Sequence, residues 1–152
     1  MNKTALGRPK DHQKREAILA TAQRLFWEQG WDYVSTEAIA KAAGVSKVTI
    51  FNAFGSKIGL VEALIERAGQ RFEDALADDA AQGTVAEQLN QLGQSLLPIL
   101  LSEEIISLEA ILTPLAHRHP SLVEKLNSEG PGKTLRLLSD RLSAIFDRLC
   151  ID

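Results

Sequence analysis

Apolar residues recur along most of the chain at steps of three and four, the period of one face of an α-helix. The spacing predicts helices over about residues 12–29, 36–43, 47–53, 57–77, 85–100, 103–116, 120–127 and 133–149. In the helix over 85–100, the side chains expected to face inward are Leu89, Leu92, Leu96 and Leu100. Few residues are β-branched, and no stretch alternates apolar and polar positions over a useful length, so no strand is expected. The predicted fold class is all-α.

Residues suited to helix ends flank the predicted helices. Gly30 and Gly44 follow two of them, where glycine takes up a left-handed conformation at no steric cost. Proline interrupts the later helices at Pro98 and Pro114, which predicts a kink or an end. The expected N-caps are Asp11, Ser35, Ser46, Ser56 and Thr84, the last in a capping box with Glu87.

Two short helices joined by the Gly44 turn predict a helix-turn-helix, whose second helix enters the major groove of DNA. The outer face of that helix carries Lys47, Thr49 and Asn52, side chains that bond base edges or phosphates. An ordinary helical hairpin with a polar surface fits the same spacing. The expected domains are residues 1–56, with a basic N-terminal arm, and a helical body over residues 57–152.

The charge of the chain is divided between these two parts. Residues 1–57 contain nine Lys and Arg and five Asp and Glu, a net charge of +4, whereas residues 58–152 carry a net charge of −7. A basic end on an acidic chain is expected where one end meets phosphate, although scattered surface charge gives the same totals.

The spacing of particular residues over about positions 12–62 resembles the TetR family of repressors. The residues that carry the resemblance are Ile18, Leu19, Ala22, Leu25, Phe26, Gly30, Ile39, Ala40, Ala43, Gly44, Val45, Ser46, Lys47, Thr49, Ile50, Phe51, Phe54, Ser56, Lys57 and Leu60. The resemblance implies a three-helix DNA-binding domain, joined by a long fourth helix to a ligand-binding and dimerising body.

The resemblance also assigns roles in DNA binding. Thr36 and Lys57 match positions that contact phosphate, and Lys47, Thr49 and Asn52 match the face of the recognition helix. The family usually has tyrosine where this chain has Phe51, so the packing is kept and a hydroxyl contact to phosphate is lost.

The segment Gly7-Arg8-Pro9-Lys10 resembles the core of an arm that enters the minor groove, which makes Arg8 and Lys10 candidate DNA contacts. A basic leader without such a role fits these four residues as well.

The body is expected to hold an effector and to dimerise, as the resemblance implies. An aromatic-poor helical body suggests a small apolar effector, and candidate lining residues are Phe72, Gln94, Glu109, Thr113 and His117. The resemblance implies two late helices in the dimer interface, whereas one is strongly patterned here; a natural short form, a truncated product and a fragment each fit that difference. The candidate dimer interface is Leu135, Leu138, Leu142, Ile145 and Leu149.

Other functions find little support in the sequence. No nucleotide-binding loop or nucleophile motif is present, so no enzyme activity and no cofactor are expected. His117 and His119 stand two residues apart and do not share a helical face, so no metal site is expected. The absence of a membrane span or secretory signal, together with a single cysteine at Cys150, indicates a cytoplasmic protein.

These observations predict a ligand-responsive repressor that binds a palindromic operator in double-stranded DNA as a homodimer. The alternative is a truncated regulator that acts as a protein-interaction module and does not bind DNA by itself.

Overall fold

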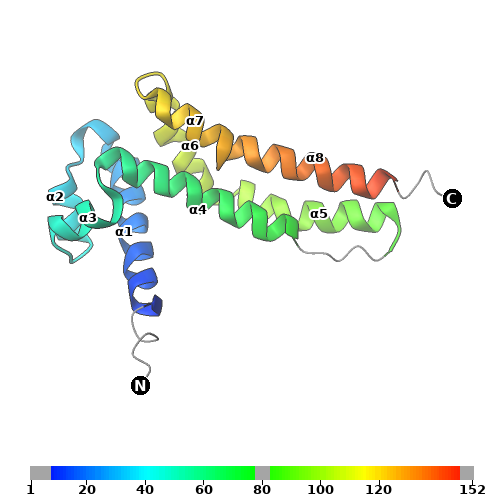
Figure 1. The fold of residues 1–152 in the computed structure, drawn as a ribbon, viewed down its shortest axis with the longest axis horizontal. Coiled ribbons are helices and arrows are strands. Elements are labelled where there is room, and N and C mark those ends of the chain that lie inside the picture. The colour runs from blue at the N-terminus through cyan, green and yellow to red at the C-terminus, as the bar shows by residue number, and fades with distance from the viewer. Residues whose placement is uncertain (1–7, 78–82, 148–152) are drawn as a thin grey trace. The chain divides into compact units, whose positions relative to one another are not determined.

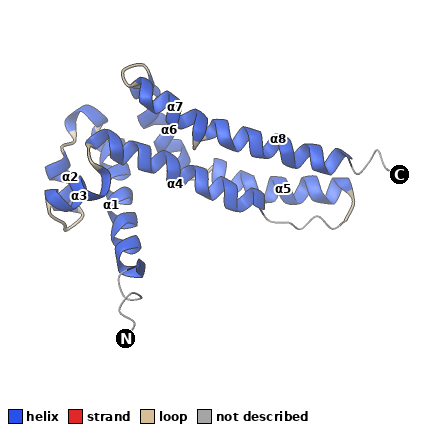
Figure 2. Cartoon of the chain, in the orientation of Figure 1, coloured by secondary structure: helices blue, strands red, loops and turns tan. Residues whose placement is uncertain are grey.

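The computed structural model describes residues 8–77 and 83–147, and the side chains from residue 11 onward. The regular structure of these residues is entirely helical, without a strand (Figure 2). The expectation of an all-α fold is confirmed.

Helices follow one another along the chain (Figure 1). Their bounds are α1 Arg8–Gln29, α2 Thr36–Ala42, α3 Lys47–Phe54, α4 Lys57–Ala77, α5 Val85–Leu100, α6 Glu103–Ala116, α7 Pro120–Ser128 and α8 Pro131–Asp147, with a short 3-10 helix η1 at Trp31–Tyr33.

The chain forms two compact units, residues 1–64 and residues 65–152. The division lies within α4, whereas the sequence suggested a boundary before that helix. The first two turns of α4 belong to the N-terminal unit because Leu60, Val61 and Leu64 are buried in its core.

The N-terminal unit packs α1, α2, α3 and the start of α4 around an apolar core. Ile18 and Phe26 of α1, Ile39 of α2 and Ile50 of α3 are each almost fully buried. Gly44 has a φ of 67°, a conformation that glycine adopts without strain, and it turns the chain between α2 and α3.

The start of α1 differs from the sequence expectation. Arg8 and Lys10 lie in the first turn of a helix that begins at Arg8, not in an extended arm before an Asp11 cap. Proline is compatible with this start because Pro9 lacks only an N–H that has no partner in the first helical turn. The side chains of Arg8 and Lys10 lie outside the described residues.

In the C-terminal unit, α5, α6, α7 and α8 pack with the rest of α4. The capping box of Thr84 and Glu87 opens α5 as expected, and Pro98 and Pro114 are accommodated within α5 and α6. Leu89, Leu92 and Leu96 of α5 are half-buried, but Leu100, expected to face inward, is 49% exposed at the end of the helix.

Backbone contact and ion pairs hold α4 against its neighbours in this unit. A Cβ atom at Gly69 would lie 1.9 Å from the carbonyl oxygen of Glu129, so α4 meets the α7–α8 junction without room for a side chain. Arg67 pairs with Glu104 of α6, and Lys133 of α8 pairs with Glu73 at 2.7 Å.

No single helix within the described residues is long and apolar enough to cross a membrane; only the bent pair of α3 and α4 taken together reaches that length and composition.

Candidate nucleic-acid interface and helical body

The helix-turn-helix is built from two short helices that are each capped by a serine. Ser35 Oγ accepts a hydrogen bond from the Ala38 N–H at 3.1 Å, and Ser46 Oγ accepts one from the Thr49 N–H at 3.1 Å. Ile39 and Ile50 bury the inner faces of α2 and α3. Burial of these faces fixes the rotation of α3, so that its remaining face is turned to solvent.

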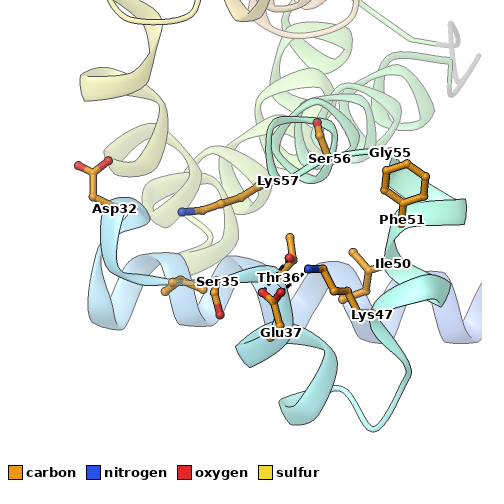
Figure 3. Close-up of a pocket in the computed structure, with 11 residues that line it drawn as sticks. Asp32, Ser35, Thr36, Glu37, Lys47, Ile50, Phe51, Gly55, Ser56 and Lys57 are labelled. Atoms are coloured by element: carbon orange, nitrogen blue, oxygen red, sulfur yellow. Dashed lines mark hydrogen bonds and ion pairs between the residues drawn. The ribbon is translucent and has the colours of Figure 1, made fainter.

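A hollow of about 520 Å³ opens on this unit between the end of η1, the start of α2, α3 and the start of α4 (Figure 3). Its lining combines polar side chains with the ring of Phe51. The lining residues are Asp32, Val34, Ser35, Thr36, Glu37, Lys47, Ile50, Phe51, Gly55, Ser56 and Lys57. Four of the predicted DNA contacts, Thr36, Lys47, Phe51 and Lys57, therefore lie around one hollow.

Lys57 is held firmly at the start of α4. Its Nζ donates a hydrogen bond to the carbonyl oxygen of Trp31 and lies 4.2 Å from the centroid of the Trp31 ring. A lysine over an aromatic face is attracted by the ring quadrupole. Gly59 allows α4 to start close to α3, since a Cβ atom there would lie 1.9 Å from the Phe54 carbonyl oxygen.

Lys47 has a different partner, the carboxylate of Glu37 across the turn between α2 and α3. Lys47 Nζ pairs with Glu37 Oε1, and Glu37 Oε2 accepts a hydrogen bond from Thr36 Oγ1 at 3.1 Å. The hydrogen bond from Lys47, with bonds from the Glu37 backbone and Thr36, lowers the pKa of Glu37 from 4.5 to about 2. Glu37 is thus ionised at any neutral pH.

The remaining predicted contacts on α3 are placed as follows. Asn52 and Phe51 are exposed, Phe51 to 66%. Thr49 is half-buried, and its hydroxyl lies 2.9 Å from Ser46 Oγ, so this side chain also supports the helix start.

Sequence reasoning did not identify Glu37 as part of this site. The pair with Lys47 spans ten positions and depends on the angle between α2 and α3, which no local pattern encodes. Asp32, Ser35 and Ser56 were also not expected to line the hollow.

In the body, the five predicted effector residues do not share one cavity. Phe72 and Glu109 line a small apolar cavity of about 60 Å³ between α4, α6 and the α7–α8 junction. Gln94 lines a different hollow, whereas Thr113 and His117 are exposed on α6 and at its C-cap. These residues come from three helices, and Glu109, Thr113 and His117 are all exposed along one face of α6 and its C-cap, so the effector site stays a prediction.

The hollow that contains Gln94 has a volume of about 340 Å³ and lies between the end of α4, α5 and α8. Most of its lining can form hydrogen bonds. The lining residues are Ala75, Leu76, Gln88, Gln91, Leu92, Gln94, Ser95 and Arg141.

The predicted dimer stripe of α8 is buried unevenly. Ile145 is 3% exposed and packs in its own chain, Leu138 and Leu142 are half-buried, and Leu135 is 65% exposed. Leu149 lies outside the described residues. Phe146, 47% exposed, adds a second uncovered apolar side chain to this helix.

Two family models match the chain, one in each part. Residues 18–64 match the model of bacterial regulatory proteins of the tetR family, and residues 87–148 match the C-terminal domain of AefR-like transcriptional repressors. The chain belongs to the TetR family of transcriptional regulators. The N-terminal match covers the helix-turn-helix and the first turns of α4.

Curated relatives agree with this family. A segment of 73 residues is 38% identical to the HTH-type transcriptional regulator EthR of Mycolicibacterium smegmatis, covering 45% of this chain and 34% of that protein. An alignment of 134 residues with the uncharacterized HTH-type regulator YvkB of Bacillus subtilis is 29% identical and covers 86% of this chain and 67% of YvkB. This TetR-family chain thus aligns with about a third of EthR.

Solved structures share the fold. The Flavonoid-responsive Regulator FrrA is 28% identical, with a TM-score of 0.68 over 90% of this chain and 70% of FrrA. A TetR-family regulator from Mesorhizobium loti has a TM-score of 0.75 over 93% of this chain and 72% of that one at 24% identity, a likeness in fold.

Proposed function

We propose that this TetR-family regulator binds double-stranded DNA through α2, α3 and the start of α4, and represses transcription from a palindromic operator as a homodimer. The observation that carries the proposal is the hollow around which Thr36, Lys47, Phe51 and Lys57 gather beside the exposed Asn52. Lysine and hydroxyl groups contact phosphates and fix the register of the protein on the duplex. Such regulators act on the bacterial chromosome, so the proposed location is the cytoplasm.

Each side chain has a proposed role on DNA. Asn52 reads a base edge, since an amide can form two hydrogen bonds with adenine in the major groove. Lys57, already fixed by Trp31, provides a positioned cation for a phosphate. Arg8 and Lys10, whose side chains lie outside the described residues, stay candidate contacts to DNA.

Selection of bound sequences from random DNA, repeated with Asn52→Ala, tests this function. The unchanged chain should enrich an inverted repeat. The Asn52→Ala variant should lose about 1–3 kcal/mol on that site and its preference at one position in each half-site. Gln13→Ala, which removes an exposed amide from α1, is the control and should keep the full preference. No enriched sequence with the unchanged chain, or an unaltered preference in Asn52→Ala, would contradict the proposal.

A small molecule bound in the body is the proposed signal that releases the operator. The 340 Å³ hollow supports this, since ligand sites begin at about 300 Å³, whereas the apolar cavity at Phe72 is far smaller. Its glutamines favour a molecule with hydrogen-bonding groups over the apolar effector that composition suggested. The name of FrrA refers to a response to flavonoids, and flavonoids are therefore the first compounds to test. Ser95→Trp, which fills the hollow, should prevent release by an active compound and leave operator binding intact.

A further inference from the structure

The Glu37 carboxylate binds two of the side chains that are proposed to contact phosphate. Glu37 Oε1 pairs with Lys47 Nζ, and Glu37 Oε2 accepts the Thr36 hydroxyl at 3.1 Å. All three residues line the hollow beside α3, where Figure 3 draws Lys47 pointing toward Glu37 and Thr36. The carboxylate therefore takes up the same donors that a DNA phosphate would use.

From this arrangement we propose that Glu37 is a specificity-determining residue, which competes with the DNA backbone for Lys47 and Thr36 and so suppresses binding to non-specific sequence. The inference rests on the proposed DNA-binding function. A phosphate that approaches Lys47 must displace the carboxylate or tolerate a negative charge beside it, and like charges across an interface oppose association. Contacts to base edges offset this cost only on the correct sequence, because phosphate contacts are common to all sequences.

The Glu37–Lys47 pair can exchange because it is open to solvent. Its side chains are 57% and 62% exposed, so a phosphate can reach Lys47, and solvent screens the attraction between the two charges. Lys47 can therefore leave Glu37 for a phosphate, whereas Lys57, part-buried between Trp31 and the start of α4, keeps its place. The competition is confined to the Lys47 side of the hollow.

The variant Glu37→Gln removes the charge and keeps the size of the side chain. Binding is measured by fluorescence anisotropy to the sequence selected by the unchanged chain and to a scrambled duplex of equal length, each over a range of salt concentrations. We expect Glu37→Gln to bind scrambled DNA roughly tenfold more tightly, with a smaller gain on the selected sequence, so that the ratio of the two affinities falls. Its affinity should also depend more steeply on salt, by up to about one further counterion released.

Two matched variants separate this local effect from net charge. Glu28→Gln makes the same charge change on α1, where Glu28 pairs with Arg24 at 2.8 Å, and should increase both affinities by less than twofold. Glu37→Asp keeps the charge and should preserve the affinity ratio. Thermal unfolding of each variant reports whether the fold is kept.

The results distinguish this inference from the function on which it rests. If the unchanged chain binds its selected sequence and Glu37→Gln leaves the affinity ratio unchanged, Glu37 does not set specificity and only the inference fails. Weaker binding by Glu37→Gln would instead show that Glu37 positions Lys47 for DNA, which also overturns it. If the unchanged chain binds no DNA, the proposed function fails and the inference falls with it.

Discussion

At the scale of single residues, the two lysines of the candidate interface, Lys47 and Lys57, are held by different partners. Lys57 is fixed by the Trp31 carbonyl and ring, so little side-chain freedom remains to be lost when it meets a phosphate. Lys47 is exposed and paired with Glu37, so the proposed contact with phosphate requires Lys47 to leave this partner. Lys57 thus suits a contact to the DNA backbone that forms on any sequence, whereas Lys47 suits a contact that depends on the sequence bound.

The pKa of Glu37 can be measured directly. In an NMR titration of its side-chain carboxyl we expect a value of about 2, and in Lys47→Ala a rise toward the ordinary 4.5, because the largest stabilisation of the carboxylate comes from Lys47. A lowered pKa contributes stability above pH 4.5 that is lost as the pH falls toward 2. An unchanged pKa in Lys47→Ala would show that the pair is not formed in solution.

Phe51 offers a second test at this scale. Phe51→Tyr adds a hydroxyl to a ring that is 66% exposed and lines the hollow. We expect operator binding to tighten by roughly 0.5–1.5 kcal/mol, the net value of one hydrogen bond, or more because phosphate is charged. Equal or weaker binding in a gel-shift titration would mean that this ring does not face the DNA backbone.

At this scale the sequence predicts what is local. A predicted helix cap is expected to accept a hydrogen bond from the N–H group three residues further along the chain. This is found for Ser35, Ser46 and Thr84. The pair of Glu37 with Lys47 could not be predicted in this way, because it depends on how two helices cross.

At the scale of elements, the periodicity of apolar residues predicted every α-helix of the described residues but not the 3-10 helix η1, and most ends fall within a residue or two of the expected positions. Two predictions were wrong, namely that α1 begins after an Asp11 cap and that Leu100 faces inward. Periodicity marks the apolar face of a helix but not how much of that face its neighbours cover, which explains the error at the end of α5.

Glycines of α4 and α5 provide a matched pair of substitutions. Gly69→Ala should unfold at lower urea concentration, because its Cβ atom would lie 1.9 Å from the Glu129 carbonyl oxygen and overpacking costs about 1–3 kcal/mol. Gly93→Ala meets nothing within 4 Å and should stabilise the chain by roughly 0.5–1 kcal/mol through helix propensity. Equal midpoints for the two variants would contradict the close contact of α4 with the α7–α8 junction.

At the scale of the whole molecule, the distribution of charge agrees with the functions proposed for the two units, DNA binding for the first and effector binding with dimerisation for the second. The chain is acidic overall, with a net charge of −3, yet its first 57 residues carry +4. The candidate DNA-binding residues could be proposed from the sequence because the motif that carries them has a fixed spacing. A candidate effector site could not be located in this way, since a pocket is formed by side chains from several helices and the sequence does not show how those helices pack.

Dimerisation through α8 is the prediction that belongs to this scale. Leu135 is exposed and starts the apolar stripe, so Leu135→Glu should leave the fold intact and convert a dimer into a monomer. Ser121→Glu, an exposed change on α7, should remain dimeric. Light scattering at tens of micromolar distinguishes these states, and a monomeric unchanged chain would contradict dimerisation.

DNA binding itself is tested most directly by the salt dependence of affinity for the selected operator. The basic N-terminal unit is proposed to act largely through phosphates, each of which releases a counterion when a lysine or arginine binds it. We expect the logarithm of affinity to fall steeply and linearly with the logarithm of salt concentration between low and moderate salt. An affinity that stays flat over that range would contradict this prediction.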